Sequence, residues 1–174
     1  SAAQTAPAYN LGKQINAGGW IEDWASASKD RRITLLSGSQ PYSDYRIEFQ
    51  AQIENKAVGW MYRGVNPRNY YVVKIEKLKS GIEPVVAVVR YAVIDGKNER
   101  RVETLLPMKV RVDTHYKVRF DAVGSEFAVW VQDQKIDEWR DTRLGSGGVG
   151  LYAEGDEIAA IDGTVNVYEL VSTR

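Results

Sequence analysis

The chain of 174 residues contains no cysteine and one histidine. Without cysteine it forms no disulfide, carries no thiolate nucleophile and offers no zinc-thiolate site. Because His115 is the single histidine, a metal centre built on several imidazoles is excluded as well. Any catalysis would therefore rest on carboxylates, lysine, tyrosine or hydroxyl groups.

Two further absences limit the partners. No run of 18 or more apolar residues occurs, so the sequence predicts no membrane span. Lysine plus arginine and aspartate plus glutamate number 23 each. Because this balance leaves no excess positive charge to attract a polyanion, we do not expect nucleic acid as a partner.

The hydrophobic pattern has a period of two over most of the chain. In Tyr45–Ile53 apolar and polar residues alternate strictly, which predicts a strand with its odd-numbered side chains in the core. Tyr116–Ala122 repeats the pattern and puts its even-numbered side chains in the core. Further short strands, bounded by turn residues, are expected at Ala57–Arg63, Tyr70–Glu76, Pro84–Ile94, Arg101–Leu106, Glu126–Gln132 and Gln134–Trp139.

These strands predict an all-β sandwich or barrel of about ten to twelve strands. No window has the apolar spacing of an amphipathic helix. The run Val85–Val89 is apolar at every position, so we expect it in the centre of a sheet or under a covering loop.

Two neighbouring segments carry a resemblance to a known superfamily. Val58–Arg63, followed by Asn66–Ile75, resembles the paired strands of the concanavalin A-like lectin/glucanase sandwiches. The later half of that superfamily is resembled by Tyr116–Phe120, Glu126–Val131, Asp141–Leu151 and Ala159–Val167. The resemblance covers about Trp20 to Leu170 and implies a two-sheet antiparallel jelly-roll sandwich. It is shared by laminin G-like modules, carbohydrate-binding modules, family 16 glucanases and 3-keto-disaccharide hydrolases, so it does not choose a function.

The expected organisation is a leader or linker at 1–15 and a single β-sandwich domain at 16–174. The small-residue run Ser1–Ala8 is typical of a linker or of the region after a removed signal or anchor, and equally of an expression remnant. We expect an extracytoplasmic bacterial protein, periplasmic, secreted or on the cell surface, and possibly a fragment of an anchored chain.

The polar residues of the predicted strands suggest a ligand site. If the strands pair, one exposed sheet face would carry Arg46, Glu48, Arg63, Tyr70, Lys74, Arg119 and Asp121. Aromatic rings that stack on sugars, together with charged groups that bind their hydroxyls, form a glycan site. The alternative is a solvated sheet face with cross-strand ion pairs.

The five tryptophans also admit two interpretations, as core residues or as sugar platforms. Strand parity favours burial of Trp60, Trp130 and Trp139. Trp20 and Trp24 precede the first clear strand, and they either cap the edge of the sandwich or stand exposed on a loop.

Two aspartates are candidate ligands of a structural calcium. Asp141 and Asp162 fall in predicted strand-end loops, where related sandwiches sometimes hold this ion. The pair Asp162-Gly163 is also an ordinary turn signal. His115 is expected in the turn before Tyr116, as a loop residue rather than a general base.

The glucanase motif, three acidic residues alternating along one strand, is absent. The nearest approach, Glu154-Gly155-Asp156-Glu157, is expected to be a loop that does not hold two carboxylates at a fixed separation. We therefore favour a non-catalytic glycan-binding module. The alternatives are a 3-keto-disaccharide hydrolase-like enzyme acting through Glu48 and Asp121, and a protein-protein interaction or architectural domain. For the enzyme, the strand from Asn55 keeps Arg63 but lacks the Asn-Ser pair usual before the glycine.

Overall fold

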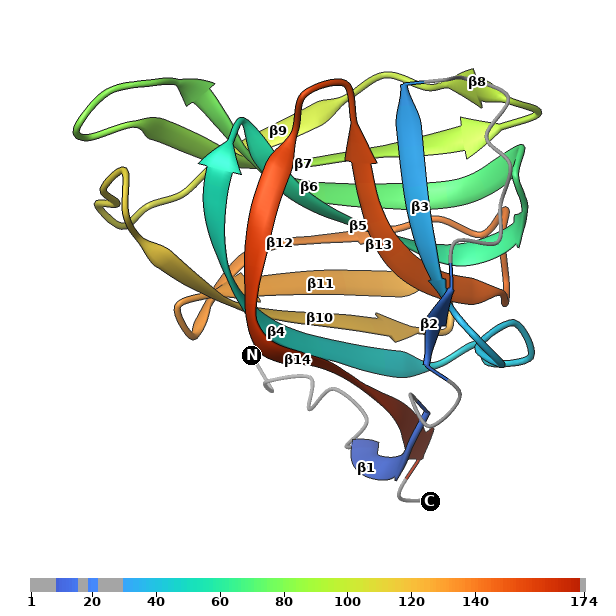
Figure 1. Ribbon diagram of the computed structural model, residues 1–174. Coiled ribbons are helices and arrows are strands. Elements are labelled where there is room, and N and C mark those ends of the chain that lie inside the picture. Colours follow the sequence, from blue (N-terminus) through green and yellow to red (C-terminus); the bar gives the residue numbers. More distant parts are fainter. Residues whose placement is uncertain (1–8, 16–18, 22–29, 173–174) are drawn as a thin grey trace, which may run out of the picture.

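A computed structural model describes residues 9–15, 19–21 and 30–172, and in them the chain forms strands and turns without a helix (Figure 1). The strands are β1 (Tyr9–Gln14), β2 (Trp20–Ile21), β3 (Arg31–Leu36), β4 (Tyr45–Asn55), β5 (Ala57–Asn66), β6 (Asn69–Lys79), β7 (Val85–Ile94), β8 (Lys97–Asn98), β9 (Val102–Leu105), β10 (His115–Val123), β11 (Glu126–Val131), β12 (Gln134–Arg140), β13 (Gly148–Glu154) and β14 (Ile158–Ser172). The predicted all-β class is confirmed.

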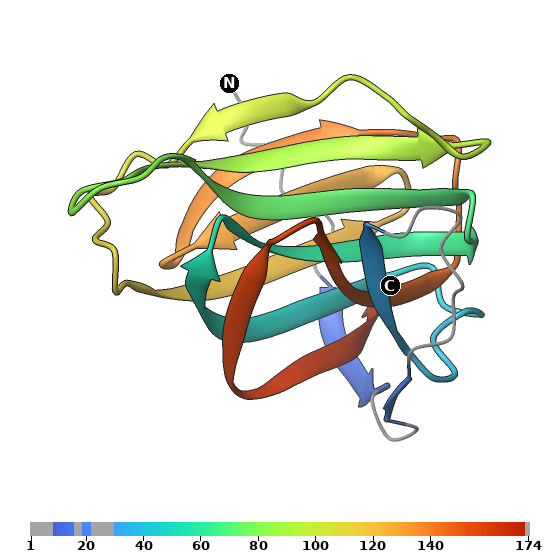
Figure 2. The same ribbon diagram turned by 45° about the horizontal axis from the view of Figure 1, so that its top comes forward.

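The strands form two stacked antiparallel sheets. Sheet A has six strands in the order β1-β14-β4-β10-β11-β12. Sheet B has eight, in the order β2-β3-β13-β5-β6-β7-β8, with β9 pairing on β7. Figure 2 shows the green strands β5 to β7 of sheet B in front of the orange strands of sheet A. This arrangement confirms the predicted two-sheet jelly-roll sandwich.

The alternating segments behave as predicted. In β4 the odd-numbered residues from Tyr45 to Ile53 are buried, and their polar neighbours are more exposed. In β10 the even-numbered residues are buried in the same way. The register places Phe49 opposite Val118 and Ile47 opposite Phe120, so both strands turn their apolar faces toward sheet B.

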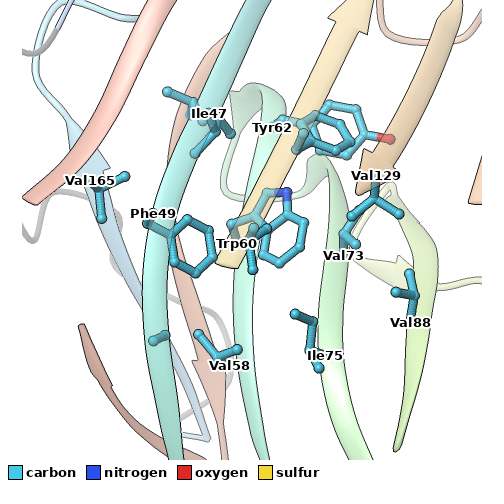
Figure 3. Packing of buried hydrophobic residues seen from close by; sticks show 14 of the residues in the cluster. Ile47, Phe49, Val58, Trp60, Tyr62, Val73, Ile75, Val88, Val129 and Val165 are labelled. Carbon is cyan, nitrogen blue, oxygen red and sulfur yellow. The ribbon is translucent and has the colours of Figure 1, made fainter. Parts of the chain in front are cut away.

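Trp60 lies at the centre of the core between the sheets (Figure 3). Its side chain has no solvent exposure, and its ring packs edge-on to Phe49 at 5.5 Å and to Phe120 at 5.9 Å between ring centres. Edge-to-face contacts at this distance add to the stabilisation from apolar burial. The predicted burial of Trp60 is confirmed.

Sheet B is buried on both faces. A second apolar cluster covers the face turned away from sheet A, and it consists of Ile33, Leu35, Met61, Tyr70, Val72, Ala87, Val89, Tyr91, Val93 and Tyr152. Along β7, Val86 and Val88 belong to the core between the sheets, whereas Ala87 and Val89 belong to this second cluster. The uninterrupted apolar run of β7 therefore lies in the body of a sheet, as predicted.

The N-terminal part of the described chain is attached to both sheets. Strand β1, within the predicted leader 1–15, pairs with β14 so that Leu11 lies opposite Leu170. Ile15 is buried in the core, and Trp20 of β2 packs against its edge. Residues 1–8 and Trp24 lie outside the described residues. No helix in the described part of the chain is long and apolar enough to cross a membrane.

Candidate functional site

The seven predicted ligand residues do not share one face. Strands β4 and β10 carry Arg46, Glu48, Arg119 and Asp121 on the outer face of sheet A. Arg63 of β5, with Tyr70 and Lys74 of β6, belongs to sheet B, and none of these three has solvent exposure. The prediction of one exposed face is therefore wrong. Parity along each strand distinguishes two faces, but it does not tell which strands join the same sheet.

The outer face of sheet A is hollowed into a groove of about 800 Å³, which we call the sheet A groove. Its polar and aromatic walls include Tyr9, Arg46, Arg119, Asp121, Glu126, Trp130, Lys135, Glu138, Trp139 and Arg140. The groove thus contains three of the predicted residues and follows strands β4, β10, β11 and β12.

Asp121 fixes two arginines on the floor of this groove. Its carboxylate accepts hydrogen bonds from Arg46 Nε at 2.8 Å and Nη2 at 3.1 Å, and from Arg119 Nη2 at 2.9 Å. The Asp121 side chain is only 14% exposed. Because charge-assisted bonds from both sides hold the carboxylate, the two guanidinium groups have defined positions before any ligand arrives.

Trp130 stands beside these arginines. The register places it opposite Arg119 on one neighbouring strand and opposite Lys135 on the other. The centre of its ring lies 4.1 Å from the Arg119 guanidinium carbon and 5.5 Å from Lys135 Nζ. Both cations lie over the indole, and because Trp130 is only half-buried, the part of the ring that they leave open can contact a sugar ring in the groove.

The predicted burial of Trp130 in the core is wrong. Strand β11 buries its other parity set, which contains Phe127 and Val129, and so turns Trp130 to the half-buried outer face. Trp139 of β12 packs partly buried against the core, opposite Phe127. Parity did not identify Trp130 as a site residue, but Ala128, which shares its parity, is too small to mark a core face and was the available signal that this side of β11 points outward.

Arg63 joins three loops inside the protein. Its guanidinium donates to the carbonyl oxygens of Ser43 at 2.8 Å, Leu144 at 3.0 Å and Gly124 at 2.7 Å. Its backbone N–H donates to the Tyr45 hydroxyl at 2.7 Å, and its φ of 51° lies in the left-handed region. This unusual backbone conformation interrupts the register of β5, and the buried guanidinium supplies donors to carbonyls that otherwise lack them.

Lys74 is the centre of a second polar cluster, on the outer face of sheet B. Its Nζ lies 2.5 Å from Glu154 Oε1 and 2.8 Å from Glu157 Oε2. The rings of Tyr91 and Tyr152 lie 5.7 Å and 5.2 Å from the same nitrogen. The expectation that the 154–157 segment holds no two carboxylates at a fixed separation is wrong, because Lys74 binds both glutamates.

Burial shifts the pKa of the ionisable groups in this cluster, and at Glu154 the charge of Lys74 opposes it. Burial raises the pKa of the Tyr91 and Tyr152 hydroxyls. Burial alone would raise the pKa of the Glu154 carboxyl too, but the hydrogen bond and charge of Lys74 outweigh it, so the pKa is lowered. Arg31 of β3 lies beside the cluster. It donates hydrogen bonds to the Tyr70 hydroxyl at 3.0 Å and to Asn98 Oδ1 at 2.5 Å.

The two candidate calcium ligands are engaged with other side chains. Asp141 accepts hydrogen bonds from the Tyr71 hydroxyl at 2.6 Å and from Arg143 Nε at 3.0 Å. Asp162 Oδ2 lies 2.6 Å from Nδ1 of His115, which begins β10 rather than lying in the preceding turn.

These aspartates lie at opposite ends of β10. The backbone N–H of Asp141 donates to Ser125, just beyond the end of β10, whereas Asp162 meets its first residue. A nine-residue strand is roughly 30 Å long, so the two carboxylates do not share one ion. Among the described residues no group of three or more histidine and acidic side chains forms a metal site. Calcium at either aspartate stays a prediction.

Comparison with known proteins identifies the fold. No family of known proteins and no curated protein sequence matches this chain. The carbohydrate-binding module CBM66 from Bacillus subtilis superposes with a TM-score of 0.64 at 19% identity, over 92% of this chain and 98% of the module. A Bacillus subtilis protein of unknown function with a galectin-like fold gives 0.62 at 12% identity, over 95% of this chain and all of that one.

A tetrameric galectin from the ball sponge Cinachyrella sp. gives a TM-score of 0.56 at 14% identity, over 78% of this chain and 99% of the galectin. At these identities the likeness concerns the fold alone. The chain has the lectin-type β-sandwich fold that the concanavalin A-like resemblance implied, and the comparisons do not single out the laminin G-like branch.

Proposed function

We propose that this protein is a non-catalytic, extracytoplasmic module that binds a glycan in the sheet A groove. The observation that carries the proposal is Trp130, which stands in an open groove beside Arg119, itself fixed by Asp121. The similarity of the fold to a carbohydrate-binding module and to galectins supports the same ligand class.

The groove and the sheet face beside it offer the three kinds of contact that a sugar needs. The part of the Trp130 indole that Arg119 and Lys135 leave open provides an apolar surface for a sugar ring. Arg46 and Arg119 provide N–H donors for hydroxyl oxygens. Glu48, opposite Arg119 on the same sheet face, does not line the groove itself, but its carboxylate accepts no hydrogen bond from any described residue and is available to a sugar hydroxyl beside the groove.

A glycan array followed by titration calorimetry tests this proposal. Trp130→Ala and Arg119→Ala should each weaken binding to the selected sugar about tenfold or more, since each removes a direct contact. Arg111→Ala, which removes an exposed side chain that does not line the groove, is the matched control and should bind as the unaltered protein does. Equal affinity of all three variants would exclude the groove as the site.

The calcium prediction is tested in the same assay. The array is run with calcium and again with a chelator. Loss of binding in chelator would connect Asp141 or Asp162 to the ligand, whereas unchanged binding would show that glycan recognition needs no calcium.

The enzymatic alternative rests on Glu48 and Asp121. The register pairs Glu48 with Arg119 and Asp121 with Arg46, so the two carboxylates are diagonal neighbours on adjacent strands. Turnover of oxidised or ordinary disaccharides that is lost in Glu48→Gln would favour the hydrolase, whereas binding without turnover favours the module. Recovery of a protein partner with a silent glycan array would instead favour the interaction domain.

A further inference from the structure

The sheet A groove continues around β12 into a smaller hollow at the edge of the sandwich. This hollow, which we call the edge pocket, has a volume of about 90 Å³ and is lined by residues of both sheets. Trp139 and Arg140 line the groove and the edge pocket alike. The two spaces therefore share a wall formed by β12.

Four arginines line the edge pocket: Arg90, Arg100, Arg140 and Arg143. Two of them are neutralised within the protein. Arg90 Nε lies 2.8 Å from Asp137 Oδ2, an ion pair that connects β7 of sheet B with β12 of sheet A. Arg143 lies 2.5 Å from Asp141 and 2.5 Å from Glu99.

The other two arginines have no such partner. The side chains of Arg100 and Arg140 are exposed, and neither forms a hydrogen bond or ion pair with another residue in the part of the chain that the structure describes. The lining of the edge pocket thus contains four arginines and two carboxylates, those of Asp141 and Glu99, while Asp137 pairs with Arg90 and Glu126 lies opposite Arg140 without an ion pair to it. The excess positive charge is located at the two guanidinium groups that are free to bind.

Guanidinium groups recognise planar or tetrahedral anions through paired N–H donors. The edge pocket is too small for a sugar ring, but it accommodates a single carboxylate or sulfate group. The indole of Trp139 and the Arg90 guanidinium stacked 4.7 Å from its centre form a rigid, partly dehydrated wall, which strengthens a charge-assisted contact.

We propose that the glycan of the sheet A groove is anionic, and that a carboxylate or sulfate ester on it binds to Arg100 and Arg140 at the edge pocket while another sugar unit stacks on Trp130. This inference rests on the proposed function. Arg140 lies opposite Glu126, four residues along β11 from Trp130, a distance of about 13 Å. The ligand is therefore an oligosaccharide rather than a single sugar.

The test compares three probes by calorimetry: an oligogalacturonate, a sulfated galactan fragment and the same fragment after desulfation. The two anionic probes distinguish carboxylate from sulfate recognition. We expect at least one of them to bind about tenfold more tightly than the neutral fragment. The double variant Arg100→Gln/Arg140→Gln should lose that preference, so that it binds the sulfated and the desulfated fragment with equal affinity.

A matched control removes two charges elsewhere. Lys109 and Arg111 are exposed and lie in the loop between β9 and β10, so Lys109→Gln/Arg111→Gln alters the net charge equally. This control should change the affinity for the anionic probe less than about twofold at 150 mM salt, where charges more than about 8 Å apart are screened. Melting temperatures verify that both double variants fold.

Three outcomes would overturn the inference. Equal affinity for neutral and anionic fragments, with binding abolished only by Trp130→Ala, would refute the anionic ligand and leave the proposed function in place. An equal loss in both double variants would show non-specific charge attraction. Absence of binding to every probe and to the glycan array would refute the glycan module and this inference together.

Discussion

Lys74 Nζ lies 2.8 Å from Glu157 Oε2, and the side chains of the two residues are 0% and 8% exposed. Glu154, 32% exposed, binds the same nitrogen from the end of β13. The lysine thereby attaches the turn between β13 and β14 to β6, on the opposite side of β5. A buried ion pair is costly to break, because the remaining charge is left without a partner in a medium that solvates it poorly.

Replacement of Lys74 by methionine should therefore destabilise the protein strongly. We expect Lys74→Met to reduce the free energy of unfolding by about 3–5 kcal/mol in urea denaturation, since Glu157 loses its counter-charge. The triple variant Lys74→Met/Glu154→Gln/Glu157→Gln, which removes all three charges, should be more stable than the single variant. The exposed pair Lys56–Asp156 in the same region is the control, and Lys56→Met should leave the free energy of unfolding nearly unchanged. A similar loss in both single variants would contradict this account.

Arg63 should likewise be important for stability rather than for ligand binding. Lysine in its place retains the charge, but its three N–H donors are on a single nitrogen. The guanidinium of Arg63 donates from three separate nitrogens to the carbonyls of Ser43, Leu144 and Gly124, which one nitrogen does not reach together. Leaving buried carbonyls without donors costs about 1–3 kcal/mol each. Arg63→Lys should lower the melting temperature by about 6–12 °C, as scanning calorimetry would measure, whereas Arg111→Lys should not. An unchanged melting temperature would contradict this structural role of Arg63.

Protonation of Asp141 should lower the free energy of unfolding at acid pH. Burial alone would raise the pKa of its carboxyl, but hydrogen bonds from Arg143 and Tyr71 outweigh burial and lower the pKa from 3.8 to about 2. A carboxyl with a depressed folded-state pKa contributes stability above the unfolded value near pH 4, and this contribution is lost as the pH falls toward 2. We expect a loss of about 2 kcal/mol over this range.

Urea denaturation at several pH values between 2 and 7 would measure this effect. Asp141→Asn should be less stable at pH 7 and should show a flatter dependence below pH 4. Some dependence should persist, because the pKa of Glu154 is lowered too. Identical pH profiles for the variant and the unaltered protein would show that Asp141 contributes nothing.

Local patterns predicted much of this fold. The alternation in Tyr45–Ile53 and Tyr116–Ala122 identified their inward side chains correctly, because a strand turns successive side chains to opposite faces whatever surrounds it. The apolar run of β7 indicated burial on both faces for the same reason. The fold class followed from these periods and from the turn residues between them.

The candidate site was predicted only in part. Arg46, Glu48, Arg119 and Asp121 do lie together, because their strands pair directly. Trp130 was assigned to the wrong face, since both parity sets of β11 contain large apolar residues. Arg63, Tyr70 and Lys74 were assigned to the surface, because polar residues usually lie there.

The sequence by itself therefore determined which residues form strands, which turns separate them and which side chains of one strand share a face. Those features depend on backbone geometry and on neighbours a few residues away. Only the tertiary structure decided that Lys74 meets Glu157, that Arg63 meets three separate loops, and that Trp130 lies beside Arg119. Each of these contacts joins segments brought together by the pairing of strands into two sheets and by the packing of those sheets, which a short window of sequence does not contain.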